Sequence, residues 1–256
     1  MTDRKETHEV TDRPHVLLYL NAGDIRIKEG APGAVVIAMS GNPDLIDAVE
    51  IDATADTVTV RSTQKKRRWF GGSIDTVVTL PTDSDLTIHN GAGDIIVSVT
   101  VADLEIHNGA GDIRGDDVLG ASEFKVGAGD IRMGALGGPA KLSSASGDVR
   151  IDKATELVVS TASGDLYLGD VSESARIKSA TGDIRIRKFA GNDLEIKTMS
   201  GDCAIGLIPG VVVKAQIKTM SGDFRNRIKP SAGEKTGTMN LAVTSFSGDV
   251  VLKSAK

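Results

Sequence analysis

A Gly-Asp pair followed by an apolar residue recurs along the chain, and this repeat constrains the fold more than any other feature of the sequence. From Asp94 onward, the steps between successive aspartates are 18, 18, 18, 17, 18, 19, 21 and 26 residues. Such a regular period, held over this many copies, is typical of a solenoid in which each repeat forms one coil. The aspartates of the series are Asp24, Asp94, Asp112, Asp130, Asp148, Asp165, Asp183, Asp202, Asp223 and Asp249.

The residues around each aspartate predict two strands per coil. The positions eight and six residues before it are apolar in most coils and flank a polar residue, as Leu104 and Ile106 flank Glu105. The positions one and three residues after it are again mostly apolar, and an arginine such as Arg185 often stands between them. This period-two alternation indicates half-buried strands. The intervening glycine suits a turn with positive φ, and the aspartate can accept hydrogen bonds from turn N–H groups.

We therefore predict an all-β fold, a parallel β-solenoid (β-helix) of ~18-residue coils with an N-terminal β lid, because a single coil cannot bury its apolar face alone. The predicted organisation is a disordered tail over residues 1–14, a β lid with opening rungs over 15–82, and solenoid repeats over 83–256. Inward Ser and Thr residues four positions before the aspartates are expected to form hydrogen-bonded ladders from coil to coil. One interior column is expected to contain Ile106, Phe124, Leu142, Ile177 and Ile196.

Composition and motifs argue against catalysis and against general nucleic-acid binding. The chain carries 30 basic and 35 acidic residues, whereas nucleic-acid binders are normally basic overall. Two tyrosines and one tryptophan are too few for the stacking groove of a carbohydrate-active β-helix enzyme. Neither a G-x-S-x-G elbow nor a Walker-type loop is present. We expect a non-enzyme with no cofactor and no small-molecule substrate.

The predicted location is the cytoplasm. The first residues are charged and contain no apolar signal-peptide core, and no run approaches the ~18 apolar residues of a membrane span. The one cysteine, Cys203, excludes an intramolecular disulfide and occupies an inward position, where we expect a small buried hydrophobe.

The serial Ser-Gly-Asp-apolar turns carry a family resemblance. Residues 144–151 (SASGDVRI), 205–210 (IGLIPG) and 219–226 (TMSGDFRN) resemble the bacterial "putative adhesin" β-strand-repeat family of unknown function, also described as the toastrack domain. The resemblance covers residues 15–256 and implies that fold. It also implies a link to cell-envelope stress systems, in which members are often fused to membrane segments. We expect this chain to be a variant without an export signal or membrane segment.

The aspartate series is the first candidate site. Stacked carboxylates repel one another unless they are hydrogen-bonded, paired or bound to cations. Residues 108–120 resemble calcium-binding β-roll repeats. Those repeats recur every nine residues and place the aspartate two residues after the last glycine, whereas here the aspartate directly follows the glycine and recurs about every eighteen residues. We favour a structural turn ladder paired with outward arginines and assign no metal ligand; a calcium-binding, β-roll-like protein is the alternative. The arginines are Arg114, Arg132, Arg150, Arg185 and Arg225, and the ladder comprises Asp94, Asp112, Asp130, Asp148, Asp165, Asp183, Asp202, Asp223 and Asp249.

A short basic-aromatic segment is the second candidate site. Four consecutive cations precede the only tryptophan, a combination that suits contact with anionic lipid or an acidic partner surface. The alternative is a solvated hairpin tip whose aromatic rings pack on the lid. The residues are Lys65, Lys66, Arg67, Arg68, Trp69 and Phe70.

Two histidines are the third candidate. His89 and His107 both stand five residues before successive turn aspartates, so they should stack on neighbouring rungs. Two imidazoles at that spacing could share a metal ion, but Lys125 and Ser143 follow in the column and neither is a suitable third ligand. We therefore expect exposed strand residues.

The leading hypothesis for function is a non-enzymatic scaffold or interaction protein that presents a repetitive charged face to a partner or to its own copies. The alternative is a peripheral membrane or envelope-stress component that contacts anionic lipid through residues 65–70. Solenoid ends expose strand edges and need covering. Little sequence is left to cover the C-terminal rung at residues 247–256, so we expect this rung, or the flank beside it, to form the contact in self-association.

Overall fold

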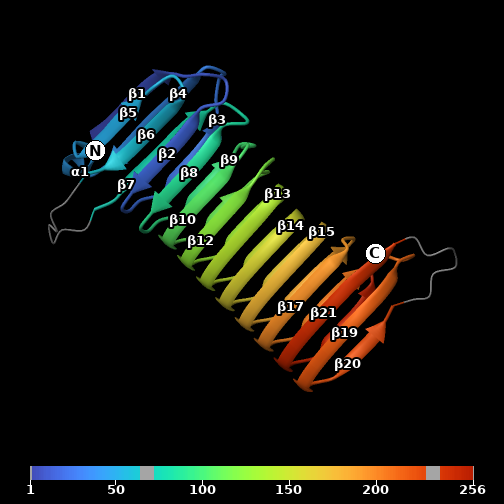
Figure 1. The fold of residues 1–256 in the computed structure, drawn as a ribbon. Helices are drawn as coiled ribbons and strands as arrows, with labels where there is room; N and C mark the ends of the chain where they lie inside the picture. Colours follow the sequence, from blue (N-terminus) through green and yellow to red (C-terminus); the bar gives the residue numbers. More distant parts are fainter. Residues whose placement is uncertain (1, 64–71, 229–236, 256) are drawn as a thin grey trace. The chain divides into compact units, whose positions relative to one another are not determined.

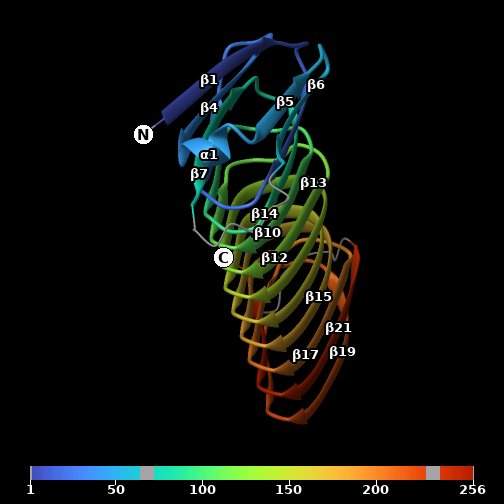
Figure 2. The same ribbon diagram turned by 90° about the vertical axis from the view of Figure 1, so that its left-hand side faces the viewer.

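The protein is an all-β solenoid, which confirms the predicted fold class (Figures 1 and 2). The computed structural model describes residues 2–63, 72–228 and 237–255. The chain divides into two compact units, residues 1–129 and 130–256, and parallel coils occur in each. The predicted boundary between lid and repeats, after residue 82, falls inside the first unit.

Unit 1 is built from two rows of strands, and from β6 onward successive strands alternate between the rows. The first row runs β5–β6–β2–β8–β10–β12 and the second runs β1–β4–β7–β3–β9–β11. Pairing is parallel except at the start of each row, where β5, β4 and β1 are antiparallel to their neighbours. The elements are β1 (Thr2–Glu9), β2 (His15–Leu20), β3 (Ile25–Glu29), β4 (Ala34–Gly41), α1 (Pro43–Ile46), β5 (Val49–Ala53), β6 (Thr57–Ser62), β7 (Ile74–Leu80), β8 (Asp85–Asn90), β9 (Ile95–Ser98), β10 (Leu104–Ala110), β11 (Ile113–Gly115) and β12 (Ser122–Ala128).

The start of unit 1 corrects the prediction of a disordered tail. Thr2–Glu9 form β1, which pairs along its whole length with β4. The charged sequence is ordered because the edge of β4 supplies backbone partners and its half-buried charged side chains lie close to groups of opposite charge. Arg4 binds Glu6 at 2.6 Å and donates to the carbonyl of Val49 at 2.7 Å, while His8 lies 3.3 Å from Glu6. These polar side chains cover this end of the unit, as an end cap must.

The only helix in the described residues is the single turn α1. Asn42 caps it by accepting a hydrogen bond from the amide of Asp44 at 3.0 Å, and Pro43 occupies the first turn. No helix in this part of the chain is long and apolar enough to cross a membrane.

Unit 2 continues the same two-strand coil. In β13, β14 and β15 the second strand of one coil runs without a break into the first strand of the next, so that each strand is 15 or 16 residues long. Figure 2 shows these successive turns of the chain. The elements are β13 (Ile131–Ser146), β14 (Val149–Ser163), β15 (Leu166–Thr181), β16 (Ile184–Phe189), β17 (Asp193–Ser200), β18 (Cys203–Leu207), β19 (Val212–Ser221), β20 (Phe224–Arg227), β21 (Thr238–Ser247) and β22 (Val250–Ser254).

The strand register places the predicted interior residues in columns. In unit 1, Ile88, Ile106 and Phe124 are Cα partners on β8, β10 and β12, and all three are buried. In unit 2 the corresponding column is also buried up to its last member, Ile217, which is half-buried. Its members in spatial order are Leu142, Val159, Ile177, Ile196, Val243 and Ile217.

The last coils of unit 2 are not stacked in chain order, and this corrects the predicted open coil at residues 247–256. Strand β21 lies between β17 and β19 (Figure 1). Strand β22 lies between β18 and β20. The coil that ends the chain is therefore internal. The outermost coil of the unit is formed by β19 and β20, which we call the terminal rung.

The inward hydroxyl groups also differ from the prediction. Ser144, Thr161 and Thr198 each donate to the carbonyl oxygen two residues further along the same coil, at 3.3 Å. These bonds bridge the turn within one coil and do not link neighbouring coils. The acceptor of Thr198, the carbonyl of Ser200, also accepts from the amide of Gly182 on the neighbouring coil at 3.1 Å.

Candidate functional site

The turn aspartates form a continuous hydrogen-bonded ladder within each unit. The backbone amide of each aspartate donates to a carboxylate oxygen of the aspartate on the neighbouring coil, as from Asp183 to Asp165 and from Asp202 to Asp183. The bonds are 2.8–3.1 Å long. At the end of unit 2 the ladder follows the spatial order, since Asp249 donates to Asp202 and Asp223 donates to Asp249. One oxygen of each of these acceptor carboxylates is thus used by a turn amide.

Outward arginines pair with the second carboxylate oxygen in several coils. The arginine two residues after the aspartate donates to it at 2.7–3.1 Å in five coils, and Arg225 also lies 3.2 Å from Asp249. Arg150 differs: it lies over the ring of Tyr167, 4.4 Å from the centroid, and 3.4 Å from Asp152. The five pairs are Arg26–Asp24, Arg114–Asp112, Arg132–Asp130, Arg185–Asp183 and Arg225–Asp223.

Asp183→Ala is expected to lower the free energy of unfolding by about 1–2 kcal/mol, because it leaves the amide of Asp202 without its charged acceptor. Asp183→Asn is the matched control. It keeps an oxygen for that amide and weakens only the exposed pair with Arg185, so we expect a loss of about 0.5 kcal/mol. Urea unfolding followed by circular dichroism measures both. Equal losses in the two variants would show that the amide bond contributes nothing.

The terminal rung is the second candidate site. Among the described residues, β19 has one strand partner, β21, and β20 has one, β22. The inward side chains of this rung are correspondingly uncovered: Ile217 is half-buried, and Phe224 is 46% exposed. The opposite situation holds at the start of unit 1, where Arg4, Glu6 and His8 form a polar cover.

An exposed apolar ridge runs up to the terminal rung. Three large apolar side chains occupy the same position on three adjacent coils: Met199 is 64% exposed, Phe246 57% and Met220 78%. Contiguous exposed apolar side chains of this size mark interaction surfaces more often than isolated ones do. The position three residues before the aspartate holds, in spatial order, Gly91, Gly109 and Gly127 in unit 1, and Ala145, Ala162, Ala180, Met199, Phe246 and Met220 in unit 2.

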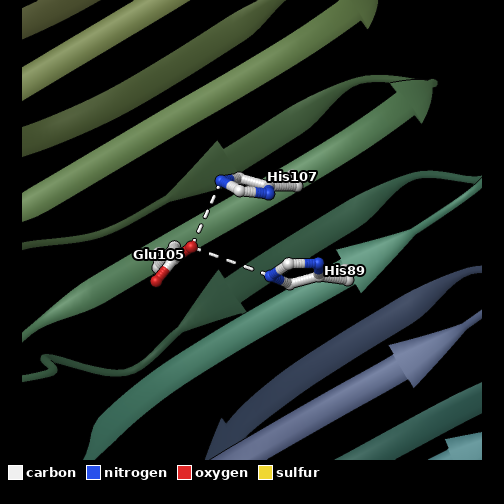
Figure 3. A group of neighbouring side chains, drawn as sticks. All are labelled: His89, Glu105 and His107. Atoms are coloured by element: carbon white, nitrogen blue, oxygen red, sulfur yellow. Dashed lines mark ion pairs between the residues drawn. The ribbon is translucent and has the colours of Figure 1, made fainter.

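The third candidate is a cluster of two histidines and a glutamate in unit 1 (Figure 3). His89 and His107 are Cα partners on β8 and β10, with ring centroids 4.3 Å apart. A carboxylate oxygen of Glu105 lies 3.7 Å from Nε2 of His89 and 3.2 Å from Nε2 of His107. Glu105 precedes His107 by two residues and therefore projects from the same face of β10. Sequence reasoning missed it by searching for a third ligand only in the histidine column.

The electrostatic surroundings favour the neutral form of His107. Burial lowers the pKa of this imidazole below its ordinary value, and His89 and Lys125 lower it further, while Glu105 and Glu123 oppose the shift. The two rings also line an open pocket of about 490 Å³, together with Tyr19, Leu20, Asn21, Ser62, Asn90, Gly91, Asn108, Gly109 and Lys125.

Cys203 offers no reactive thiol. The side chain is buried, and burial raises the pKa of the thiol to about 12, with Asp202 and Asp183 adding to the shift. A thiol with so high a pKa is protonated at neutral pH and is a poor nucleophile.

The repeated coil is characteristic of a known protein family. A family model described as "Toastrack DUF4097" matches residues 15–254. The chain belongs to this family. No curated protein matches the sequence.

Solved structures similar to this toastrack chain have low sequence identity. A "putative adhesin" from Bacteroides fragilis NCTC 9343 has a TM-score of 0.50 at 12% identity, over 98% of this chain and 97% of that chain. A "putative adhesin" from Parabacteroides distasonis ATCC 8503 has a TM-score of 0.46 at 12% identity, over 97% of both chains. A "Putative lipid binding protein" from the same strain scores 0.44 at 14% identity, over 95% of this chain and 96% of that chain. At this identity the first likeness shows a shared fold only.

The structure places some, but not all, of the residues that the sequence predicts as sites. The turn aspartates lie in the ladders just described, and His89 and His107 come together with Glu105. The basic-aromatic segment of Lys65, Lys66, Arg67, Arg68, Trp69 and Phe70 lies outside the described residues, so its contact with a partner or membrane stays a prediction.

Proposed function

We propose that this toastrack chain is a non-enzymatic interaction scaffold that assembles head to tail with copies of itself through the terminal rung. The observation that carries the proposal is that β19 and β20 each have an edge without a strand partner among the residues that the structure describes, with Ile217 half-buried and Phe224 exposed on this rung. Strand edges of this kind add a further strand readily. The apolar ridge of Met199, Phe246 and Met220 extends the same surface.

The charge of the terminal rung argues against contact between two identical edges. Within residues 212–227 there are four basic residues, Lys214, Lys218, Arg225 and Arg227, and one acidic residue, Asp223. Two copies meeting edge to edge would oppose lysine with lysine, and like charges directly opposite one another across strands are destabilising.

The complementary surface lies on unit 1 of the same chain. Residues 43–60 contain no lysine or arginine. Among the described residues, the edge strand β5 has one partner, β6, and the acidic side chains of Glu50 and Asp52 on it are exposed. Asp47 and Asp56 flank that strand. A basic rung on one copy and an acidic edge on the next form a heterologous contact, which generates rings or filaments.

The proposal predicts association that depends on protein concentration and on salt. Size-exclusion chromatography coupled to light scattering is expected to give species above the monomer mass at tens of micromolar, and screening by about 1 M salt is expected to reduce them. Ile217→Lys should abolish association by placing a charge in the uncovered interior of the rung. Val158→Lys is the matched control, since Val158 is an exposed apolar residue on β14 with strands on both sides.

Charge reversal tests the identity of the two surfaces. We expect Lys214→Glu/Lys218→Glu and Glu50→Lys/Asp52→Lys each to be monomeric, and a mixture of the two variants to associate again. A wild-type chain that stays monomeric at these concentrations overturns the proposal. Association that survives both reversals also overturns it, because it would run through another surface.

A further inference from the structure

We propose that His89, Glu105 and His107 form a binding site for Zn²⁺, independent of the terminal rung. The two imidazoles and the carboxylate each offer one ligand atom, and these three atoms lie within 4.8 Å of one another. Two histidines and one carboxylate are a donor set that first-row divalent ions such as Zn²⁺ prefer.

The distances are close to those that a bound ion requires. With Zn–N and Zn–O bonds of about 2.0–2.1 Å, the ligand atoms of a tetrahedral site lie about 3.3 Å apart. The Glu105 oxygen is 3.2 Å from Nε2 of His107 and 3.7 Å from Nε2 of His89. The remaining difference is a few tenths of an ångström, and Figure 3 shows that both Nε2 atoms of these half-buried side chains already point toward the carboxylate.

The backbone holds these side chains in place. The parallel register fixes His89 beside His107, and Tyr19 packs on the other side of His89 with ring centroids 5.0 Å apart and the rings tilted by 51°. Lys125 continues the column on β12 and closes the far side of His107. Because the register is set by the buried columns of the solenoid, the donor atoms are positioned without any metal.

The buried Nε2 atom of His107 is available to a metal ion. It makes no hydrogen bond in the described structure, although the Glu105 oxygen is close. On other coils the same two positions hold a Glu–Lys pair, Glu123 with Lys125 and Glu195 with Lys197, and Glu195 also binds Arg176 of the neighbouring coil. Only at Glu105, among these three coils, does a second histidine from the neighbouring strand share the carboxylate.

The pocket beside the two histidines gives the site access to solvent. Three protein ligands leave one position of a tetrahedral ion for water or for a small anion entering from the pocket. The proposed site therefore keeps an open coordination position, unlike a structural zinc site with four protein ligands.

The test uses the full chain without an affinity tag, freed of metal by dialysis against a chelator and titrated with ZnCl₂ by calorimetry. We expect one Zn²⁺ per chain. His89→Gln/His107→Gln should abolish that binding, and Glu105→Gln should weaken it by about 100-fold, since loss of a direct ligand should cost at least as much as loss of a supporting residue. Co²⁺ absorption gives an independent readout, because tetrahedral coordination has an intense visible band.

His8→Gln is the matched control. His8 lies 3.3 Å from Glu6 with the same spacing in sequence but has no second histidine beside it, so its removal should leave Zn²⁺ binding unchanged. Unaltered circular dichroism of all variants excludes unfolding as the cause. Zn²⁺ binding weaker than about 100 μM in the wild type overturns the proposal, as does binding that survives the double substitution.

Discussion

Ile177→Asp is expected to lower the free energy of unfolding by about 4 kcal/mol or more, or to prevent folding altogether. Ile177 is fully buried, between Val159 and Ile196 in the interior column of unit 2. An aspartate there would lie among aliphatic side chains without a cation or hydrogen-bond donor, so it must either ionise in an apolar interior or bind a proton. Either course costs several kcal/mol, which is a large part of the stability of a typical domain.

Lys178→Asp is the control for Ile177→Asp. It introduces the same side chain one residue away on β15, at an exposed position on the outer face. We expect its effect on the free energy of unfolding to stay within about 0.5 kcal/mol. Urea unfolding monitored by circular dichroism distinguishes the two. Equal midpoints for both variants would mean that Ile177 does not face the interior.

The coil architecture could be predicted because every coil repeats the same constraints. A strand inverts all its side chains if its register shifts by one residue, so the alternation around Ile106 and Ile177 specifies which faces are buried. The steps of 17 to 19 residues between successive turn aspartates from Asp94 to Asp202 then specify the coil length. This information is local to each coil and does not depend on which coil is its neighbour.

The order of the last two coils could not be read from the repeat alone, because both match the same pattern. Their inward residues explain the order. The coil of β21 and β22 places Leu241, Val243 and Leu252 inside, and all three are buried. The coil of β19 and β20 has Ala215 and Asn226 at the positions of Leu241 and Leu252. The more apolar coil takes the internal place, where it is covered on both sides, and the coil with the polar residue takes the end. The polar residue Asn226 at an inward position was therefore the sequence signal for the outermost coil.

The candidate sites were harder to predict because they depend on contacts between columns. Glu105 and His107 belong to different positions of the repeat, and the shared carboxylate becomes visible only when neighbouring coils are aligned on the same outer face. The apolar ridge was detectable in the sequence as a change from alanine to Met199 and Phe246 at one position. The ordered strand β1 was not detectable in the sequence, because its residues are polar and its partner β4 lies 25 residues or more along the chain.

The turn glycines provide the second large expected effect. Gly182 has φ of 125°, a region that residues with a side chain rarely adopt, and a Cβ atom added to it would lie 2.1 Å from the carbonyl oxygen of Gly164 on the neighbouring coil. The turn must pass this close because the amide of Asp183 donates to the Asp165 carboxylate at 2.9 Å. Gly182→Ala therefore combines backbone strain with a contact that only separation of the coils can relieve.

Gly182→Ala is expected to lower the free energy of unfolding by about 3 kcal/mol or more, the sum of about 1–2 kcal/mol of strain and the cost of displacing the neighbouring turn. Gly210→Ala separates the two contributions. Gly210 also has positive φ, 83°, but a Cβ atom there would meet nothing within 4 Å, so only the strain of about 1 kcal/mol remains. Thermal and urea unfolding of both variants measures the difference. If the two alanines destabilise the protein equally, the close approach of successive turns contributes nothing, and the strain of positive φ alone accounts for the glycine at every turn.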